Sequence, residues 1–444
     1  MKRDDPLPNL HAPVPGPASR AWLQRLRAVE SPNVTAIGDD FPVVWQRARG
    51  ALVWDVDGNR YLDAGSAFGV AFIGHGHPAV REAAHAQVDT LLHGMGDVHP
   101  PTARIALLEL LDVLTPGDLG HGVLCTGGSE AVEVALKTAM LATGKPGIVA
   151  FSDGYHGLTL GALGGTARPD FRGPFARWVP GPTTFCAYAT DAATRDRVLA
   201  EVEAALTDPQ APAGVVLIEP LQGRGGTRLP APGLLAGLRA LCDAHGALLC
   251  FDEIFTGCGR TGAFFACEHP DLGAPDGVLP DLLCIGKALG GGFPVSACLG
   301  RPQVMAAWGP SAGEALHTST FLGHPVAAAA AVAALTAIRD EGLVARARDD
   351  GAALLATLRD ALGDHPAVRE IRGRGLMLGV DLGDGGLAWR VVLGCLRRGV
   401  LLLPCGTGGH VVQLTPPAVM SAAQRTYVVD VLVDAVHEQA QTAA

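Results

Sequence analysis

Short apolar runs alternate with longer amphipathic stretches between about residue 78 and residue 325. Short apolar runs are typical of buried strands, and the longer stretches are typical of helices that bury one face. The expected helices are Pro101–Leu114, Glu130–Ala142, Arg197–Leu206 and Leu234–His245, and the expected strands are Val123–Cys125, Ile148–Phe151, Val215–Ile218, Ala247–Phe251 and Leu282–Ile285. This alternation predicts an α/β fold with a mostly parallel sheet between two layers of helices.

The N-terminal segment follows a different pattern. Residues 1–20 are rich in proline and polar residues, which predicts an arm without a core of its own. A hairpin is expected at residues 51–63, with Asp55-Val-Asp-Gly-Asn59 as its turn. This turn resembles the start of a calcium loop, but no glutamate stands at the twelfth position, so we expect a plain turn without a metal.

The chain beyond Pro325 predicts a smaller α+β unit. Helices are expected at Val326–Ile338 and Leu343–Leu362, and strands at Leu376–Leu382, Val400–Leu403 and Val411–Leu414. A chain of 444 residues is too long for one simple core. We therefore expect an N-terminal arm and hairpin (1–75) that pack with the small domain, a large domain (76–325) and a C-terminal small domain (326–444).

The composition excludes several classes of protein. Hydrophobic residues make up 48% of the chain and charged residues 18%, which is typical of a well-buried globular protein. The net charge of −10 argues against nucleic-acid binding. The ten cysteines form no C-x-x-C pair, and several lie in apolar strands, which fits a reducing compartment. With no signal peptide and no membrane-spanning stretch, a cytoplasmic location is expected.

Two strand ends carry the most informative chemistry. The strand Leu282–Ile285 leads into a glycine-rich turn that contains Lys287, and the strand Ala247–Phe251 ends on Asp252. A lysine that forms a Schiff base and an aspartate that pairs with a pyridinium nitrogen are the groups that pyridoxal phosphate (PLP) requires from a protein. Taken singly, the lysine is expected to be solvated and the aspartate to cap a helix. Together they indicate a PLP site.

Further polar clusters follow other predicted strands. Gly128 and Ser129 open a helix, where backbone N–H groups bind an anion such as a phosphate, although a simple helix cap explains the same residues. The absence of a Walker lysine disfavours a nucleotide phosphate. Tyr155 could stack on a flat ring, and Ile254 could pack on its opposite face. Glu219 and the hydroxyl-rich stretch around Thr320 complete a set of strand-end clusters that indicates one shared site.

The chain resembles a class III (ω-type) aminotransferase of PLP fold type I from about Gly50 to its C-terminus. The motifs that carry this resemblance are Gly58-Asn-Arg-Tyr-Leu-Asp63, Gly74-His-Gly-His-Pro78, Gly128-Ser-Glu-Ala131, Tyr155-His-Gly157, Glu219-Pro-Leu-Gln222, Asp252-Glu253, Gly259-Arg-Thr-Gly262, Lys287 and Ser319-Thr-Phe321. Their presence together and in this order is specific.

The resemblance implies a role for each matching residue. Lys287 would form the Schiff base and move the proton, and Asp252 would keep the pyridine nitrogen protonated. Tyr155 and Ile254 would enclose the ring, with His156 beside them, and Glu219 would join the acidic hydrogen-bond network behind it. Gly128 and Ser129 would hold the phosphate together with Thr320 of a neighbouring subunit, so the resemblance implies a homodimer with a shared active site.

The chain departs from the resembled family at positions that face the substrate or the ring. Leu158 stands where GABA- and ornithine-type members have an arginine, Arg224 stands in place of a glutamate, and Gln413 in place of the arginine that binds the α-carboxylate. Arg224 and Gln413 together suggest a compensated exchange that keeps one cation, although drift at two solvent-facing positions explains the same residues. Phe68 matches a substrate-wall position, and Phe255 replaces the usual glutamine.

The sequence therefore predicts a transaminase that moves an amino group from an amino acid or amine to a 2-oxo acid in two half-reactions. An amino-acid racemase or epimerase of the same fold would use the same lysine and aspartate. A non-catalytic protein of this fold is disfavoured, because Lys287, Asp252 and the phosphate-binding residues are all retained.

Overall fold

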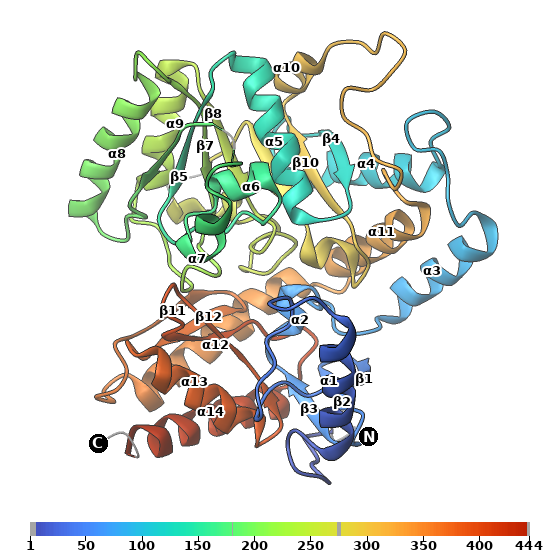
Figure 1. Ribbon diagram of the computed structural model, residues 1–444, viewed down its shortest axis with the longest axis vertical. Helices are drawn as coiled ribbons and strands as arrows, with labels where there is room; N and C mark the ends of the chain where they lie inside the picture. Colours follow the sequence, from blue (N-terminus) through green and yellow to red (C-terminus); the bar gives the residue numbers. More distant parts are fainter. Residues whose placement is uncertain (1–5, 180, 273–276, 442–444) are drawn as a thin grey trace.

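The computed structural model describes residues 6–179, 181–272 and 277–441, which form two lobes (Figure 1). The central lobe is built on a seven-stranded sheet, and the terminal lobe on two four-stranded sheets that combine the beginning and the end of the chain. In Figure 1 the blue N-terminal and the red C-terminal segments lie side by side below the central lobe.

The sheet of the central lobe is mostly parallel, as the sequence predicts. Its strands are β4 (His121–Cys125), β5 (Gly147–Phe151), β6 (Thr183–Cys186), β7 (Ala213–Ile218), β8 (Leu248–Asp252), β9 (Leu282–Ile285) and β10 (Ser296–Gly300), in the order β4-β10-β9-β8-β7-β5-β6. Strands β9, β8, β7, β5 and β6 run parallel, and β10 is antiparallel to both of its neighbours. The sequence prediction missed β6 and β10, because threonines and small residues dominate them and pairing with neighbours decides their structure.

Helices cover both faces of this sheet. Those of the central lobe are α3 (Pro78–Thr90), α4 (Thr102–Leu114), α5 (Gly128–Thr143), α6 (Leu160–Gly165), α7 (Pro169–Arg172), α8 (Ala192–Leu206), α9 (Leu234–His245), α10 (Pro302–Met305) and α11 (Pro325–Asp340), with short 3₁₀ turns η1 (Gly173–Phe175), η2 (Ala266–Glu268), η3 (Pro270–Leu272), η4 (Lys287–Gly290) and η5 (Ala306–Trp308). Alternate residues of β7 point to opposite sides: Val215 and Leu217 pack with α5, whereas Val216 and Ile218 belong to the core that contains α8 and α9. Burial on both faces explains why these strands are continuous apolar runs.

The terminal lobe joins segments that are far apart in the sequence. One sheet contains β1 (Trp45–Arg49), β2 (Leu52–Asp55), β3 (Arg60–Asp63) and β13 (Val400–Leu401), and the other contains β11 (Glu370–Arg374), β12 (Met377–Asp381), β15 (Val411–Leu414) and β14 (Leu403–Cys405). Its helices are α1 (Pro17–Val29), α2 (Ser66–Gly69), α12 (Leu343–Leu362), α13 (Gly385–Leu396) and α14 (Ala422–Gln441). Strand β13 pairs with β3, which ties the two ends of the chain together.

One local prediction for this lobe is wrong. The predicted strand Val400–Leu403 is divided between β13 and β14, which belong to different sheets. Helix α1 begins at Pro17, inside the predicted arm, because the Asp57 carboxylate of the hairpin turn accepts hydrogen bonds from Ala18 N and Ser19 N at 2.7 and 2.8 Å. The domain boundaries remain a prediction. Among the described residues, no helix has both the length and the apolar character needed to cross a membrane.

Candidate functional site

Five of the predicted site residues lie at one edge of the central sheet. Asp252 is the last residue of β8, and Lys287 follows β9 after a single glycine. Glu219 follows β7, and Tyr155 and His156 lie in the loop after β5. Because these four strands are parallel, their carboxyl ends meet at the same edge, where open α/β sheets bind ligands. This edge brings together residues that are up to 132 positions apart.

Asp252 is held by a buried histidine. Its Oδ2 lies 2.7 Å from His156 Nδ1, and its Oδ1 accepts a hydrogen bond from Ile254 N at 3.1 Å. His156 in turn donates its backbone N–H to Thr166 Oγ1. Burial alone would lower the pKa of His156, but the hydrogen bond and charge of Asp252, helped by Glu219, outweigh burial and raise it above its ordinary value. The pair therefore favours a positively charged imidazole beside a carboxylate.

Glu219 connects two loops of the site. Its Oε1 accepts a hydrogen bond from Tyr155 N at 3.0 Å, and its Oε2 accepts one from Gly223 N at 2.9 Å. Burial raises the pKa of Glu219, and the nearby charge of His156 only partly offsets this effect. Glu219 thus fixes the backbone of the Tyr155 loop and of the loop that carries Arg224.

Lys287 is half-buried and has an unusual backbone conformation, with φ +44°. Burial lowers the pKa of its amine, Asp252 and Glu219 partly oppose this effect, and the charges of Arg224 and Arg260 lower the pKa further. Its Nζ lies 4.3 Å from the ring centroid of Phe255. A lowered pKa increases the fraction of neutral, nucleophilic amine at neutral pH.

A compact glycine cradle lies beside these side chains. Gly128 and Ser129 form the first turn of α5, whose leading N–H groups point out of the helix. A Cβ atom on Gly128 would lie 2.9 Å from Ile254 Cδ1, and one on Gly157 would lie 2.4 Å from Ser129 Oγ. A side chain at either position would press on these neighbours, so the helix N-terminus, Ile254 and the Tyr155 loop form one tightly packed unit.

These residues fit PLP. A carboxylate fixed by His156 suits a protonated ring nitrogen, an amine with a lowered pKa suits a covalent link, and a glycine-rich helix N-terminus suits a phosphate. His156, which the sequence prediction included without a defined role, is explained as the partner of Asp252.

The residues predicted to face the substrate come from both lobes. The guanidinium carbon of Arg224 lies 4.8 Å from the ring centroid of Tyr155 and 5.6 Å from that of Phe171. Gln413, on β15, donates hydrogen bonds to Gly223 O and Thr227 Oγ1 at 3.2 and 3.0 Å. The Gln413 amide therefore binds the loop that carries Arg224.

The two apolar candidates are exposed. Leu158 is 48% exposed and follows the Tyr155-His-Gly157 motif, and Phe68 is 64% exposed. Phe68 lies in a left-handed turn, with φ +62°. The residue after it, Gly69, abuts the Phe255 ring, since a Cβ atom there would lie 2.3 Å from Phe255 Cε2. Phe255, which also covers Lys287, thus places this turn next to the site.

Thr320 is exposed in the segment before α11. Its neighbours contact the segment that joins α3 and α4: Thr318 Oγ1 donates to Asp97 Oδ2 at 2.9 Å, and the Phe321 ring packs against His93. None of the contacts among the described residues joins Thr320 to Gly128 or Ser129 of its own chain, so its role as a phosphate ligand remains a prediction.

The sequence prediction missed residues whose roles depend on distant partners. Thr166 supports His156, and Arg372 of β11 binds the backbone of Gly226 and Thr227. The motif around Arg260 was recognised without a role; its buried guanidinium donates to Leu376 O and Pro416 O and so joins the two lobes. Arg372 carries no signal in a single sequence that distinguishes it from a surface arginine.

The comparisons with known proteins agree with this geometry. Residues 34–436 match the family model described as Aminotransferase class-III. The chain is 42% identical over 344 residues to an acetylornithine aminotransferase of Methanopyrus kandleri (78% of this chain, 82% of the relative). It is 37% identical over 430 residues to a 4-aminobutyrate aminotransferase of Mycobacterium bovis (91% and 92%). An ornithine aminotransferase structure from Toxoplasma gondii, with PLP at partial occupancy in its active site, superposes with a TM-score of 0.83 at 30% identity (96% and 95%).

Replacing His156 with phenylalanine should lower the free energy of unfolding by about 3–5 kcal/mol near pH 6, because a buried carboxylate loses its partner. Because the pKa of His156 is raised in the folded protein, the ionic contribution of the pair to stability is fully present below the ordinary pKa of histidine. It is lost as the pH rises through the pKa that His156 has in the folded protein. The loss should therefore be smaller at pH 9 than at pH 6, as measured by urea denaturation of both proteins.

The matched control is His77→Phe. His77 Nε2 lies 3.1 Å from Glu341, whose side chain is half exposed, so this change should cost less than about 1 kcal/mol. Equal losses in the two variants, or a loss in His156→Phe that grows with pH, would contradict the role assigned to the buried pair.

Proposed function

This chain belongs to the class III aminotransferase family, and we propose that its sheet-edge site, with Lys287 and Asp252 at the centre, binds the cofactor and carries out the reaction. The protein is a PLP-dependent enzyme that transfers an amino group from an amino acid or amine to a 2-oxo acid. The observation that supports the site best is the placement of both residues at the ends of adjacent parallel strands.

Each residue at the centre of the site has a proposed task. Bound PLP supplies an electron-withdrawing ring that weakens bonds to the carbon atom bearing the amino group. Lys287 Nζ holds the cofactor covalently and, once released, takes and returns the proton of that carbon. Asp252, fixed by His156, keeps a proton on the ring nitrogen. Gly128 and Ser129 bind the phosphate, Tyr155 and Ile254 enclose the ring, and Glu219 fixes the surrounding loops.

Amino-group transfer is favoured over racemisation by the relatives, which are named as aminotransferases. The two reactions need the same lysine and aspartate, so the residues at the centre of the site do not distinguish them. Transfer converts the amino donor into the corresponding oxo compound and needs a 2-oxo acid acceptor, whereas racemisation returns an amino acid and needs no acceptor.

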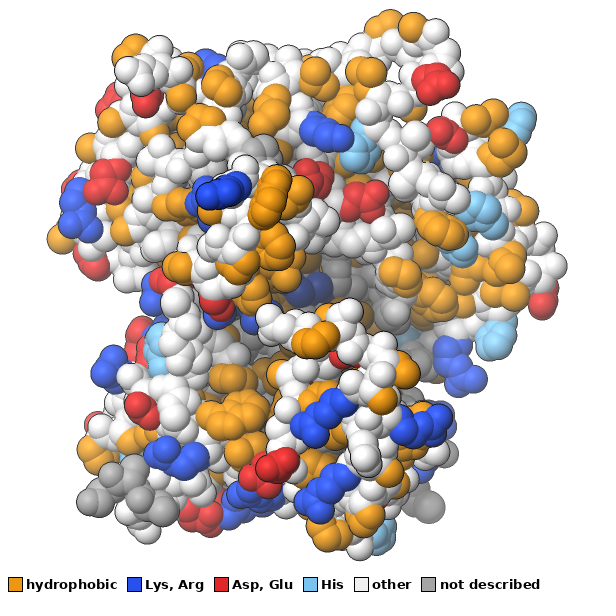
Figure 2. All heavy atoms as spheres, viewed as in Figure 1, with side chains coloured by type: hydrophobic (Ala, Val, Ile, Leu, Met, Phe, Trp, Pro, Cys, Tyr) orange, Lys and Arg blue, Asp and Glu red, His pale blue; other side chains and the backbone are white. Residues whose placement is uncertain are grey.

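A homodimer is the proposed working unit, and the cytoplasm its proposed location. Apolar side chains are exposed along the α3–α4 connection (Leu91, Leu92, Met95 and Val98) and near Thr320 (Leu316 and Phe321). Orange side chains and histidines gather on this side of the molecule, at the right of Figure 2. Exposed apolar patches are typical of protein interfaces. A shared interface here would explain why Thr320 faces solvent in a single chain.

A dimer that shares its active sites should bury on the order of 2,000 Å² or more. Thr320→Ala should weaken PLP binding without changing the sedimentation coefficient of the dimer, because the threonine supplies one phosphate contact. Analytical ultracentrifugation together with a PLP titration tests this. A fully active monomer would contradict the proposal.

The covalent link to PLP is tested by reduction. Borohydride treatment of the purified yellow protein should fix the cofactor to the peptide that contains Lys287, as mass spectrometry would show. Lys287→Ala should still bind PLP but lose turnover, because both cofactor exchange and proton transfer need the amine. Lys137→Ala, which changes the lysine of α5 that lies 3.2 Å from His317, serves as the control and should keep the label. Labelling of another lysine would exclude the proposed site.

Arg224 is proposed to bind the carboxylate of the 2-oxo acid. It is exposed, lies over Tyr155, and is near enough to Lys287 to lower the pKa of that amine. Arg224→Ala should raise the KM for pyruvate about ten- to a hundredfold and leave PLP affinity unchanged. Arg168→Ala is a matched control, since Arg168 also lies over Phe171 but is paired with Asp170. An unchanged KM for pyruvate in Arg224→Ala would show that the presence of Arg224 and Gln413 at these positions is sequence drift.

The donor pocket is proposed to favour neutral or apolar substituents. The relatives are named for acetylornithine and 4-aminobutyrate, whereas Leu158 and Gln413 offer no positive charge to the carboxylate of such a donor. These two compounds and ornithine should therefore be poorer donors than amines with apolar side chains in a coupled assay with pyruvate. If 4-aminobutyrate or ornithine proves the best donor, the pocket assignment is wrong while the transaminase activity stands.

A further inference from the structure

The loop that carries Arg224 is a tight turn, Gly223–Arg228, which we call the Arg224 loop. It is closed by two hydrogen bonds between Gln222 and Arg228, from N to O at 3.0 and 3.1 Å. Near its end, Gly226 has φ +115° and Thr227 has φ +52°. A β-branched residue rarely adopts a positive φ, so contacts from outside the loop are needed to hold Thr227 in this conformation.

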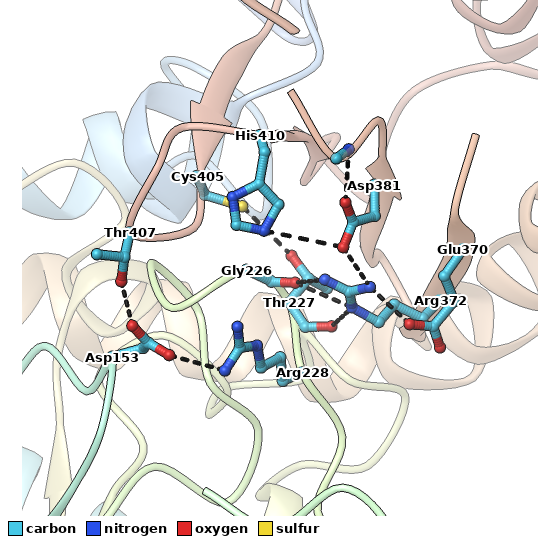
Figure 3. Close-up of polar contacts among 11 residues, drawn as sticks. Asp153, Gly226, Thr227, Arg228, Glu370, Arg372, Asp381, Cys405, Thr407 and His410 are labelled. Carbon is cyan, nitrogen blue, oxygen red and sulfur yellow. Dashed lines mark hydrogen bonds and ion pairs between the residues drawn. The ribbon is translucent and has the colours of Figure 1, made fainter. Parts of the chain in front are cut away.

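Gln413 provides one such contact, to the Thr227 hydroxyl, and Arg372, on strand β11 of the terminal lobe, provides those to the backbone. Its Nη2 donates to Gly226 O at 2.7 Å, and its Nε lies 3.1 Å from both Gly226 O and Thr227 O (Figure 3). The buried guanidinium therefore binds two successive carbonyl groups of the Arg224 loop. A planar group with several fixed donors suits this task, whereas a lysine ammonium would not reproduce it.

Two carboxylates hold the guanidinium in place. Arg372 Nη1 donates to Asp381 Oδ2 at 3.0 Å and to Glu370 Oε2 at 2.6 Å. Glu370 and Asp381 are directly paired across β11 and β12, so both belong to the same rigid ladder as Arg372. A buried charge is tolerated only with such partners. The position of the guanidinium is thus set by the sheet of the terminal lobe.

Other contacts from the terminal lobe reach the same loop. Gly406 N donates to Arg224 O at 2.8 Å. Figure 3 shows that Thr407 Oγ1 donates to Asp153, which also pairs with Arg228 at 2.7 Å. Among all these contacts, Arg372 is the charged group that reaches the backbone next to the strained Thr227. The backbone of Arg224 is therefore placed by the terminal lobe, although its sequence belongs to the central lobe.

We propose that Arg372 is a positioning residue for the reaction: it fixes the Arg224 loop against the terminal lobe and thereby sets where the Arg224 guanidinium meets the substrate carboxylate. The inference rests on the proposed role of Arg224 and extends it to a residue that has no direct contact with the substrate. Recognition of the 2-oxo acid then depends on the relative position of the two lobes. The proposed contacts with PLP all belong to the central lobe and do not depend on that position.

The test compares Arg372→Met with Arg374→Met in the holoenzyme. Arg374 lies two residues further along β11 and joins the lobes through Asp271, away from the Arg224 loop. Arg372→Met should raise the KM for pyruvate about ten- to a hundredfold, with kcat changed far less and the absorbance spectrum of bound PLP unchanged. Arg374→Met should keep the wild-type KM. Arg372→Lys, which retains the charge between Glu370 and Asp381, should fall between Arg372→Met and the wild type.

Hydrogen exchange gives a second readout that needs no substrate. The amides of Gly226, Thr227 and Arg228 should exchange about tenfold faster in Arg372→Met than in the wild type or in Arg374→Met. If Arg372→Met does not fold, Arg372→Lys serves for both measurements. Wild-type exchange and KM in the Arg372 variants, or equal effects of Arg374→Met, would overturn the proposal.

The two measurements also separate this inference from the proposed function. If hydrogen exchange rises only in the Arg372 variants but neither the wild type nor any variant transfers amino groups to pyruvate or to any other 2-oxo acid, the loop contact stands and the proposed function fails. If transfer is normal and exchange rises while the KM for pyruvate is unchanged, the proposed function stands and Arg372 does not position Arg224 for the substrate.

Discussion

The buried hydrogen bond between His156 and Asp252 is the interaction around which the site is organised. It fixes the carboxylate at the end of β8, and the charge of that carboxylate opposes the loss of the Lys287 proton that burial favours. It also joins the loop after β5, which contains Tyr155, to the end of β8, and β7 lies between these two strands in the sheet. Without this pair the buried Asp252 carboxylate would lose its hydrogen-bonded cationic partner, and the ring nitrogen of PLP would have no fixed acceptor.

Parallel strand order explains why the centre of the site was predictable from the sequence. Apolar runs located β8 and β9, and the polar residue after each run gave Asp252 and Lys287. Strands that are buried on both faces are recognised by continuous apolar runs, and their carboxyl ends necessarily meet at one edge. The motif resemblance then assigned phosphate and ring roles to Gly128, Ser129, Tyr155 and Ile254, which the structure places beside the same edge, and to Thr320, which it does not.

Contacts that depend on folding at long range were not predictable in this way. Arg372 lies 146 residues from Gly226, whose carbonyl group it binds, and nothing in the sequence links the two. The division of the segment at 400–405 between two sheets is decided by pairing with β3 and β15, which local propensity does not encode. The left-handed turn at Phe68 is likewise imposed by its surroundings, since a phenylalanine has no preference for a positive φ.

The two lobes divide the work of the site. The central lobe supplies the residues proposed to bind PLP, and the terminal lobe supplies Phe68 and Gln413 and holds the Arg224 loop. The proposed contacts with the cofactor can thus stay constant while changes in the contacts between the lobes alter which substrate is bound. Lys287 and Asp252 match motifs of the resembled family, whereas Leu158, Arg224 and Gln413, the proposed substrate-facing residues, depart from the pattern expected from the sequence.

Asp252, fixed by His156, is expected to keep a proton on the ring nitrogen of bound PLP at neutral pH. Nitrogen-15 NMR of the enzyme loaded with ring-labelled PLP measures this directly. The wild type should give the chemical shift of a protonated pyridine nitrogen, and Asp252→Asn, which removes the carboxylate but keeps its shape, should give that of an unprotonated one. An unprotonated nitrogen in the wild type, or the same protonated shift in both proteins, would contradict the role of Asp252.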